Sequence, residues 1–382
     1  MTDRLAAEVF PPGSFIKEEL EARGWTQEDL AEVLGRDTRL VSEIINGKRS
    51  ITLETATGLA AAFGTSAELW MNLQTSYQLW RERSKHEGSD VARRAKIYEK
   101  APVKLMLRRN WIHGSDNVTV LEKRILDFFT IKRLDEEPAF WEYAARKGTP
   151  YYKTLTPEQR AWLFRAKHLS KAIDAKTFAE SRLLERLEQL RLFRTSMEEL
   201  RRLSRLLADG GVRFLIIEHL PRTRIDGVCF WLDENSPVIA MSLRYDRIDW
   251  FWHTLMHEIK HVLNRDGLRE HTHLDSDLVG DKAEPTNQKP DFEQEADRFA
   301  ADFLVPQAEL NDFTARCSPL YSKMKIKQFA ARIQVHPGIV VGQLQYRGEI
   351  PYAHSREMLV PVREIVIGTT LTDGWGHMPP AL

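Results

Sequence analysis

Two histidines and a glutamate in the segment HEIKH have the spacing of a catalytic zinc site. His257 and His261 are four residues apart, so on a helix both imidazoles project from one face and can bind the same Zn²⁺ ion. Glu258 follows the first histidine, where its carboxylate can take a proton from water and pass it to a leaving amine. The segment therefore predicts a zinc-dependent hydrolytic centre.

A catalytic centre of this kind needs a third protein ligand. The extended pattern HExxHxxGxxH is absent, because Asn264 stands at the glycine position and Gly267 at the position of the third histidine. A glutamate from a second helix is the alternative. The predicted helix Asp291–Leu304 contains two candidates, Glu293 and Glu295.

We favour Glu293 as this third ligand. Asp297 lies four residues further on the same helix face, where it can hold a ligating histidine in one tautomer. Glu295 lies about 200° around the helix and is expected to point elsewhere. His253, four residues before the first ligand, is interpreted as a supporting or core histidine. The polar residues between the two helices are interpreted as exposed loop residues: Asp266, His271, His273, Asp275, Asp277 and Asp281.

Residues 1–84 form a predicted all-helical domain with a helix-turn-helix. Thr26 is a good N-cap, and Gly24 and Gly35 stand where C-terminal caps belong. The predicted helices are Ser14–Gly24, Thr26–Leu34, Thr38–Asn46, Leu53–Phe63 and Ala67–Arg81. The second and third are short and joined by a glycine-containing turn, which is helix-turn-helix spacing. The same spacing also fits a helical interaction domain that binds no DNA.

In the helix-turn-helix interpretation, the third helix lies in the major groove of DNA. The side chains predicted to contact base edges are Thr38, Arg39, Ser42 and Glu43, and those predicted to contact the phosphate backbone are Gln27, Asn46, Lys48 and Arg49. Residues 1–85 contain 10 Lys and Arg against 13 Asp and Glu, a net charge of −3. One copy should therefore bind DNA weakly, and we expect a homodimer on two half-sites.

The rest of the chain is predicted to be mainly α-helical with one small β-sheet. Residues 85–205 form a helical middle region of unassigned role, in which residues 178–207 are one long helix or a hairpin. A second domain is predicted at 206–355 and a tail at 356–382. Three strands are expected in the second domain, at residues 212–217, 226–232 and 237–243.

Composition excludes several classes of protein. The 382 residues contain 55 Lys and Arg and 55 Asp and Glu, which excludes a histone-like protein that coats polyanions. Two cysteines cannot build a disulfide framework or a Cys-rich zinc module. The first residues, MTDRLAAEVFPPGS, lack the apolar stretch of a signal peptide, and no apolar run is long enough for a membrane helix. We therefore expect a cytoplasmic protein with no membrane partner.

The segment LEARGWTQEDLAEVLGRDTRLVSEIINGKRSITLETATGLAAAFGTSAELWMNLQTSYQLWRER resembles the Xre-type helix-turn-helix of HigA/VapI-like antitoxins. The resemblance covers about 70 residues. It implies a dimer that binds operator DNA and represses its own operon. Arg36 departs from the family, which more often has a small apolar residue there, and this departure is expected to alter the DNA sequence that is bound.

The segments FWHTLMHEIKHVLN and FEQEADRFAADFLVP resemble the ImmA/IrrE family of zinc metallopeptidases. The preceding GVRFLIIEHLPRTRIDGVCFWLDENSPVIAMSL is similar to the small sheet of that family, and QVHPGIVVGQLQYRGEIPY to its C-terminal part, so the resemblance covers roughly residues 205–355. It implies a zincin-like α+β domain with zinc ligands His257, His261 and Glu293 and Glu258 as general base. Lys260 replaces a small residue and is expected to face away from the metal.

Members of that family cut helix-turn-helix repressors during stress or mobile-element induction. The leading hypothesis is therefore a DNA-binding transcriptional regulator with a zinc endopeptidase domain that cleaves such a repressor. The alternative is a HigA-like antitoxin and autorepressor whose metal-binding domain is a sensor or scaffold. In a third, weaker hypothesis the C-terminal part binds a toxin.

Overall fold

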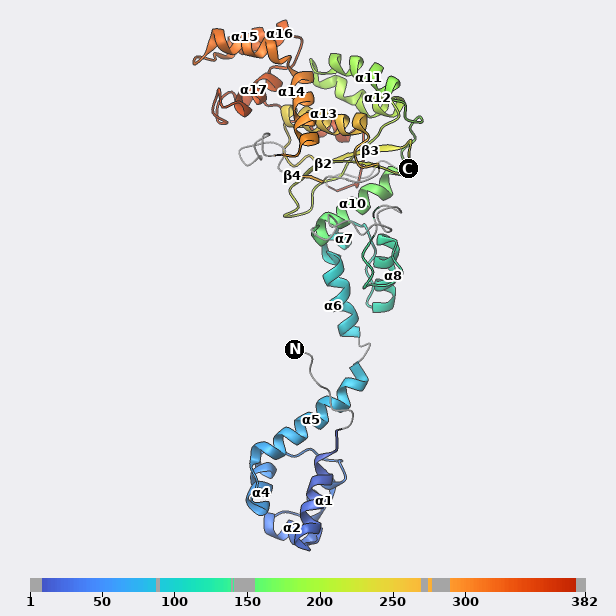
Figure 1. The fold of residues 1–382 in the computed structure, drawn as a ribbon, viewed down its shortest axis with the longest axis vertical. Coiled ribbons are helices and arrows are strands. Elements are labelled where there is room, and N and C mark those ends of the chain that lie inside the picture. The colour runs from blue at the N-terminus through green and yellow to red at the C-terminus, as the bar shows by residue number, and fades with distance from the viewer. Residues whose placement is uncertain are drawn as a thin grey trace. The chain divides into compact units, whose positions relative to one another are not determined.

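The computed structural model describes residues 9–86, 90–138, 140, 155–268, 274–276 and 289–375. The chain divides into two units, Met1–Ala95 and Lys96–Leu382, which we call the first and second unit. Figure 1 shows the first unit in blue and the second in colours from cyan to red. None of the helices among the described residues combines the length and the apolar character needed to cross a bilayer.

The first unit is helical in its described residues, as its sequence predicts. Its helices are α1 (Pro12–Arg23), α2 (Gln27–Leu34), α3 (Thr38–Ile45), α4 (Leu53–Phe63) and α5 (Ala67–His86), and α6 (Asp90–Lys100) crosses the division between the units. Thr26 begins α2 with a capping box to Asp29, and Gly24 and Gly35 end α1 and α2 in the left-handed conformation.

The packing of α1 against α3 sets the position of α3. A Cβ at Gly13 would lie 2.1 Å from the carbonyl oxygen of Ile45, so only glycine permits this approach of the start of α1 to the end of α3. Val41, Ile44 and Ile45 turn inward into the core of the unit. The opposite face of α3 remains at the surface.

A five-stranded mixed sheet organises the second unit. Its strands are β1 (Arg213–Ile216), β2 (Ile225–Trp231), β3 (Pro237–Met241), β4 (Leu274–Ser276) and β5 (Leu371–Thr372), in the order β4-β2-β3-β1-β5. Pairing is antiparallel for β2 with β3 and β4, and parallel for β1 with β3 and β5. The three predicted strands correspond to β1, β2 and β3, whereas β4 and β5 are short additions that the sequence pattern does not predict.

Alternate residues of the central strands enter two different cores. Val228, Phe230, Val238 and Ala240 pack on one face, while Cys229, Trp231, Ile239 and Met241 pack on the other. This alternation follows from the two-residue repeat of a strand. Both faces are covered, which explains why these strands are nearly continuous apolar runs.

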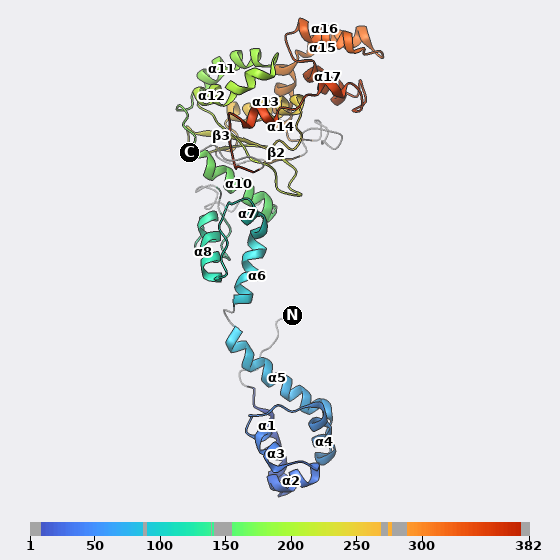
Figure 2. The same ribbon diagram turned by 180° about the vertical axis from the view of Figure 1, so that it is seen from behind.

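Helices cover both faces of the sheet (Figures 1 and 2). One core joins the sheet to α7 (Val103–Arg108), α8 (Val118–Phe129) and α10 (Pro157–Ser170). The other joins it to α11 (Glu180–Phe193), α12 (Leu203–Asp209), α13 (Ile248–Asn264), α14 (Asp291–Leu304), α15 (Gln307–Cys317), α16 (Lys323–Arg332) and α17 (Pro337–Tyr346). The expected middle region, residues 85–205, thus contributes helices to both cores.

Two segments are more structured than expected. Residues 178–207 are not one long helix but two helices that pack against each other, because α11 ends at Phe193 and a 3₁₀ helix (Met197–Arg202) precedes α12. Residues 356–375, expected as a tail, form a 3₁₀ helix (Arg356–Met358), α18 (Arg363–Ile367) and β5. Val362 and Val366 are fully buried there, so this segment belongs to the core of the second unit.

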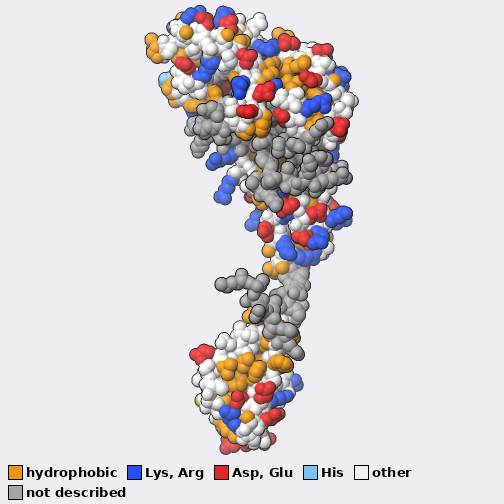
Figure 3. All heavy atoms as spheres, viewed as in Figure 1, with side chains coloured by type: hydrophobic (Ala, Val, Ile, Leu, Met, Phe, Trp, Pro, Cys, Tyr) orange, Lys and Arg blue, Asp and Glu red, His pale blue; other side chains and the backbone are white. Residues whose placement is uncertain are grey.

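Positive and negative side chains are mixed over the described surface. On the face in Figure 3, Lys and Arg alternate with Asp and Glu over both units. This mixture agrees with the zero net charge of the chain. It favours specific contacts over general attraction to polyanions.

Candidate functional site

Helix α13 carries the HEIKH segment into the interior of the second unit. Its apolar residues recur every three or four positions and pack into the core beneath the sheet, among them Phe251, Leu255, Ile259 and Val262. The same packing buries the polar residues of the segment: His257 and Glu258 are 0% exposed and His261 is 3% exposed. Buried polar groups need hydrogen-bond, ionic or metal partners, so these three side chains must interact with other groups inside the protein.

Helix α14 brings Glu293 to the two histidines. The Nε2 atoms of His257 and His261 are 3.0 Å apart, and Glu293 Oε2 lies 3.0 Å from the first of them. Glu293 Oε1 lies 3.7 Å from Nε2 of His261. Ligand atoms about 2.0 Å from one tetrahedral zinc ion are separated by roughly 3.3 Å. The three donors therefore have the mutual spacing of a tetrahedral metal site.

The other nitrogen of each imidazole faces a carboxylate. Nδ1 of His257 lies 3.0 Å from Oδ1 of Asp297, and Nδ1 of His261 lies 2.9 Å from Oδ2 of Asp266. A carboxylate accepts the Nδ1 proton, which leaves the lone pairs of the two Nε2 atoms directed at each other and at the Glu293 carboxylate. Three converging electron pairs repel one another unless a cation lies between them. The residues therefore fit a Zn²⁺ ion with two nitrogen ligands and one oxygen ligand.

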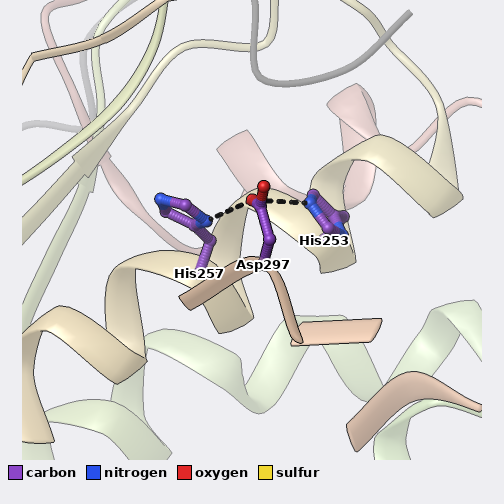
Figure 4. Close-up of side chains that lie close together, drawn as sticks. All are labelled: His253, His257 and Asp297. Carbon is purple, nitrogen blue, oxygen red and sulfur yellow. Dashed lines mark ion pairs between the residues drawn. The ribbon is translucent and has the colours of Figure 1, made fainter. Parts of the chain in front are cut away.

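Asp297 lies at the centre of a second group of charges. His253 and His257 both reach it from α13, as Figure 4 shows, and the His253 Nε2 to Asp297 Oδ1 distance is 3.7 Å. Lys289 donates to Oδ2 at 2.8 Å. Burial by itself would raise the pKa of Asp297, but the interactions of its carboxylate with His253 and His257 hold this pKa well below its usual range. Asp297 is thus an ionised carboxylate that orients His257.

Asp266 is a supporting residue that the sequence pattern did not reveal. Its place in a polar loop predicts an exposed side chain, yet its carboxylate contacts His261. The reason is local: Arg265 ends α13 in the left-handed conformation with φ of 59°, and this turn folds Asp266 back beneath the helix, where its N–H donates to the carbonyl of His261. The sequence feature that could identify this residue is an aspartate directly after the end of a helix that carries HExxH.

Two other residues of these helices pair with each other outside the cluster. Nζ of Lys260 lies 3.0 Å from Oε1 of Glu295, and Oε2 of the same carboxylate accepts a hydrogen bond from Asn264. Glu295 thus points away from the histidines, and Lys260 points away with it. His271, His273, Asp277 and Asp281 lie outside the described residues, and only the backbone of Asp275 is described, in β4.

The predicted DNA-contacting residues gather along α2 and α3 of the first unit. Thr38, Arg39, Asn46, Lys48 and Arg49 are exposed at the surface. Gln27, Ser42 and Glu43 are half-buried. The buried residues of α3 point the other way, so this face presents its polar side chains to solvent.

Glu43 partly neutralises the basic residues of this face. Nε of Arg39 donates to Oε1 of Glu43 at 2.9 Å, and Nη1 of Arg49 lies 3.6 Å from Oε2. Asn46 is also engaged, since its Nδ2 donates to the carbonyl of Ser42 at 2.8 Å. The two arginines must exchange this carboxylate for another acceptor when a polyanion binds.

Comparison with known proteins identifies the first unit. A helix-turn-helix family model matches residues 16–70. An HTH-type transcriptional regulator of Haemophilus influenzae is 42% identical over 69 residues, which are 18% of this chain and 64% of that protein. Antitoxin HigA-1 of Vibrio cholerae is 40% identical over 76 residues, 20% of this chain and 71% of that protein. The chain thus spans less than two thirds of the Haemophilus regulator.

Solved structures match over the same share of the chain. A HigA-family addiction module antidote protein from Coxiella burnetii is 40% identical, covering 20% of this chain and 85% of that chain with a TM-score of 0.20. Antitoxin HigA from Pseudomonas aeruginosa, solved with the higBA promoter, is 30% identical over 21% of this chain and 87% of that chain, with a TM-score of 0.20. From the 40% identity to the Vibrio protein over more than two thirds of its length, we conclude that this chain belongs, through its first unit, to the HigA-like helix-turn-helix family.

Proposed function

We propose that the protein is a DNA-binding transcriptional regulator whose second unit is a zinc-dependent endopeptidase. The DNA-binding part is supported by the helix-turn-helix family match and by the exposed polar face of α3. Arg39 projects from this face and can fork onto a guanine once Glu43 releases it. Lys48 and Arg49 are suited to phosphate contacts. Because the unit carries a net negative charge, two copies on two half-sites supply the affinity that one copy lacks.

Operator binding is tested with the promoter fragment of the protein's own gene and fluorescence anisotropy. Arg39→Ala should weaken binding at that fragment about tenfold or more and reduce discrimination against unrelated DNA. Lys48→Ala should weaken binding to both DNAs equally and make the affinity depend less on salt concentration. Equal binding of wild type and both variants to all DNA sequences overturns this part of the proposal.

The single observation that supports the peptidase is the convergence of His257 Nε2, His261 Nε2 and the Glu293 carboxylate, with Asp297 and Asp266 on the two Nδ1 atoms. These three ligands would hold the metal. When bound, zinc supplies Lewis acidity, which polarises a peptide carbonyl and makes water more acidic. The proposal includes a zincin-like fold for the second unit.

Residues of the chain itself transfer the proton and orient the histidine ligands. Glu258 accepts a proton from water at its carboxylate as the water oxygen bonds to the carbonyl carbon. The C–N bond then breaks, and Glu258 returns the proton to the amine nitrogen, so that a carboxylic acid and an amine result. Asp297 and Asp266 keep both imidazoles protonated on Nδ1. Burial of Glu258 excludes bulk water from the proton transfer. The expected substrate is a helix-turn-helix repressor.

The peptidase is tested with wild type, Glu258→Gln and the matched control Glu295→Gln, whose glutamate lies on α14 and pairs with Lys260. Bound metal is measured first, and each protein is then incubated with helix-turn-helix repressors from the same genome. We expect about one zinc per chain in all three proteins, and cleavage by wild type and Glu295→Gln only. Absence of zinc from wild type overturns the metal centre. Zinc without cleavage overturns the peptidase.

A second candidate function is favoured by the similarity to antitoxin HigA-1. Here the protein is an autorepressor and antitoxin, with a toxin as partner, and the zinc centre is a sensor or scaffold. The two functions predict different properties for the Glu258→Gln variant. In this second case the variant keeps both its bound zinc and its repression of transcription. Repression that responds to zinc removal but is unchanged by Glu258→Gln supports the sensor.

A further inference from the structure

A hollow of about 740 Å³ opens on the surface of the second unit between α11, α12 and the 3₁₀ helix that precedes α12. The two α-helices lie side by side (Figures 1 and 2), and Gln334, from the turn between α16 and α17, also lines the hollow. None of the described residues that line it belongs to the candidate metal centre. Small-molecule sites have volumes of about 300–1,000 Å³, so the hollow is large enough to hold a ligand of its own.

Arginines dominate the charged lining of this feature, which we call the arginine hollow. Four arginines and two acidic residues line it: Arg186, Arg191, Arg202, Arg205, Glu199 and Asp209. Both acids have basic partners. Glu199 Oε2 lies 3.0 Å from Nη1 of Arg202, and Asp209 Oδ1 is 3.1 Å from the ammonium group of a lysine outside the lining. The described lining thus has an excess of two positive charges, in a chain whose total charge is zero, and such a local excess attracts an anion.

Arg186 and Arg205 have hydrogen-bond donors to offer a ligand. Among the residues that the structure describes, Arg205 forms no ion pair and Nε of Arg186 is buried without an acceptor. The aliphatic stem of Arg186 packs against the end of α12, since a Cβ at Gly210 would lie 3.3 Å from its Cγ. Its Nη1 donates to the neutral amide of Gln189 at 3.0 Å, and its Nη2 lies 3.8 Å from Glu185, beyond hydrogen-bond distance. A guanidinium binds a phosphate through two parallel hydrogen bonds, so a phosphate group satisfies these arginines better than their present neighbours do.

Apolar side chains lie beside the arginines. Leu192 and Leu206 line the hollow, and Leu192 is 64% exposed. Phe193 also lines it, and the guanidinium carbon of Arg202 lies 5.6 Å from the centroid of the Phe193 ring. A planar base can cover the leucines and stack on a guanidinium. Inorganic phosphate would leave the leucines in water, and so would duplex DNA, because its phosphates lie outside and its bases are paired within.

From this combination we infer that the arginine hollow binds a nucleoside polyphosphate. Its phosphates contact Arg186 and Arg205, and its base lies against Leu192 and Leu206. The inference does not depend on the proposed peptidase, since the arginine hollow and the candidate metal centre share no described residue. The chain thus has a small-molecule site in addition to its DNA-binding face and its candidate metal centre.

Isothermal titration calorimetry of the full chain with ATP tests the inference. Wild type should bind one ATP per chain, and AMP, with a single phosphate, should bind at least about tenfold more weakly. Arg186→Gln and Arg205→Gln should each weaken ATP binding about tenfold, because each removes a charge-assisted contact to phosphate. Arg316→Gln is the matched control, because Arg316 is an exposed arginine of α15 that pairs with Asp312. Glu258→Gln should bind ATP like wild type.

A further variant tests the contact to the base. Leu192→Ser should weaken ATP binding about threefold or more and leave the binding of tripolyphosphate unchanged, because only the nucleotide has an apolar group to lose. Tripolyphosphate should bind wild type more weakly than ATP. Leu192 and Arg205 are exposed, so their replacement leaves the core intact even if Arg186→Gln fails to fold.

The outcomes are distinct. Absence of saturable ATP binding to wild type overturns the inference, and so does an equal ATP affinity of the control and the two arginine variants. Tripolyphosphate that binds as tightly as ATP shows a site for phosphates alone and overturns the nucleoside assignment. Displacement of ATP by unrelated duplex DNA, with a DNA affinity that falls in Arg205→Gln, assigns the hollow to the DNA backbone instead. Loss of peptide cleavage with ATP binding retained overturns the peptidase and leaves this inference standing.

Discussion

The α-carbon of Gly227 in β2 lies against the carboxyl group of Glu258 in α13, so closely that a Cβ at position 227 would be 2.3 Å from Oε1. The same Cβ would be 3.0 Å from Cγ2 of Thr254. The register of β2 with β4 shifts between Ile225 and Gly227, which marks an irregularity of the sheet at this point. A strand without a side chain at this position thus leaves room for the proposed general base.

Gly227→Ala should displace the Glu258 carboxylate and lower kcat for peptide cleavage by tenfold or more. A general base shifted by about 1 Å can cost a factor of 10². Zinc content should stay at the wild-type value, because the new methyl group would meet Glu258 and Thr254 rather than the metal-binding histidines. The control is Gly114→Ala, whose Cβ would meet Leu107 at an ordinary 3.6 Å. A wild-type kcat in Gly227→Ala would refute this role.

Asp266→Ala should weaken zinc binding about 10- to 100-fold, the usual effect of removing the carboxylate behind a histidine ligand. Without the Asp266 carboxylate, the ring of His261 is free to rotate and to adopt either tautomer. Competition titration with a chelator of known affinity measures the effect. Asp312→Ala serves as a control, because Asp312 is an exposed aspartate of α15 that pairs with Arg316. Unchanged zinc affinity in Asp266→Ala would contradict the assignment.

Glu43→Gln should strengthen binding of the first unit to DNA of any sequence about fivefold. The carboxylate holds Arg39 and Arg49 and also repels phosphates, and two unit charges 4 Å apart in water interact by roughly 1 kcal/mol. The full chain is titrated against operator and unrelated DNA at several salt concentrations. Glu68→Gln, on α5, is the charge-matched control. A selective loss at the operator would instead indicate that Glu43 contacts a base.

His168 makes the stability of the second unit depend on pH. Burial, and then the charges of Lys171, Arg165 and Lys167, lower its pKa from 6.5 to about 4. Between these values the unfolded chain binds the proton and the folded chain does not, so the free energy of unfolding falls as the pH drops from 6.5 to 4. The ring packs edge-on against Phe128, with centroids 5.0 Å apart, so phenylalanine can replace it.

Urea unfolding at pH 7 and pH 5 measures this contribution. His168→Phe should lose less stability between the two pH values than wild type. His113→Phe changes an exposed histidine near α8 and should keep the wild-type difference. An identical pH dependence in His168→Phe and wild type would exclude His168 as the source.

Much of the local structure could be predicted from the sequence. The caps at Thr26, Gly24 and Gly35 and the short apolar repeats predicted the helix-turn-helix, which the family match confirms. The sequence predicts the helix Asp291–Leu304 with the bounds that α14 has, and the spacing of His257 and His261 places two imidazoles on one face of a helix. These features depend on interactions within one turn of helix, and their period of 3.6 residues is visible in any single sequence.

The groups that surround the histidine pair depend on tertiary contacts. Glu293, Asp266 and Gly227 reach α13 from another helix, from a left-handed turn and from a strand. The arginine hollow likewise exists only because α11 and α12 pack together. One sequence was enough to predict the helices and the donor atoms they carry, because both follow from local backbone geometry. The complete site needs contacts between residues far apart in the chain, which form only when the apolar faces of these elements are buried together.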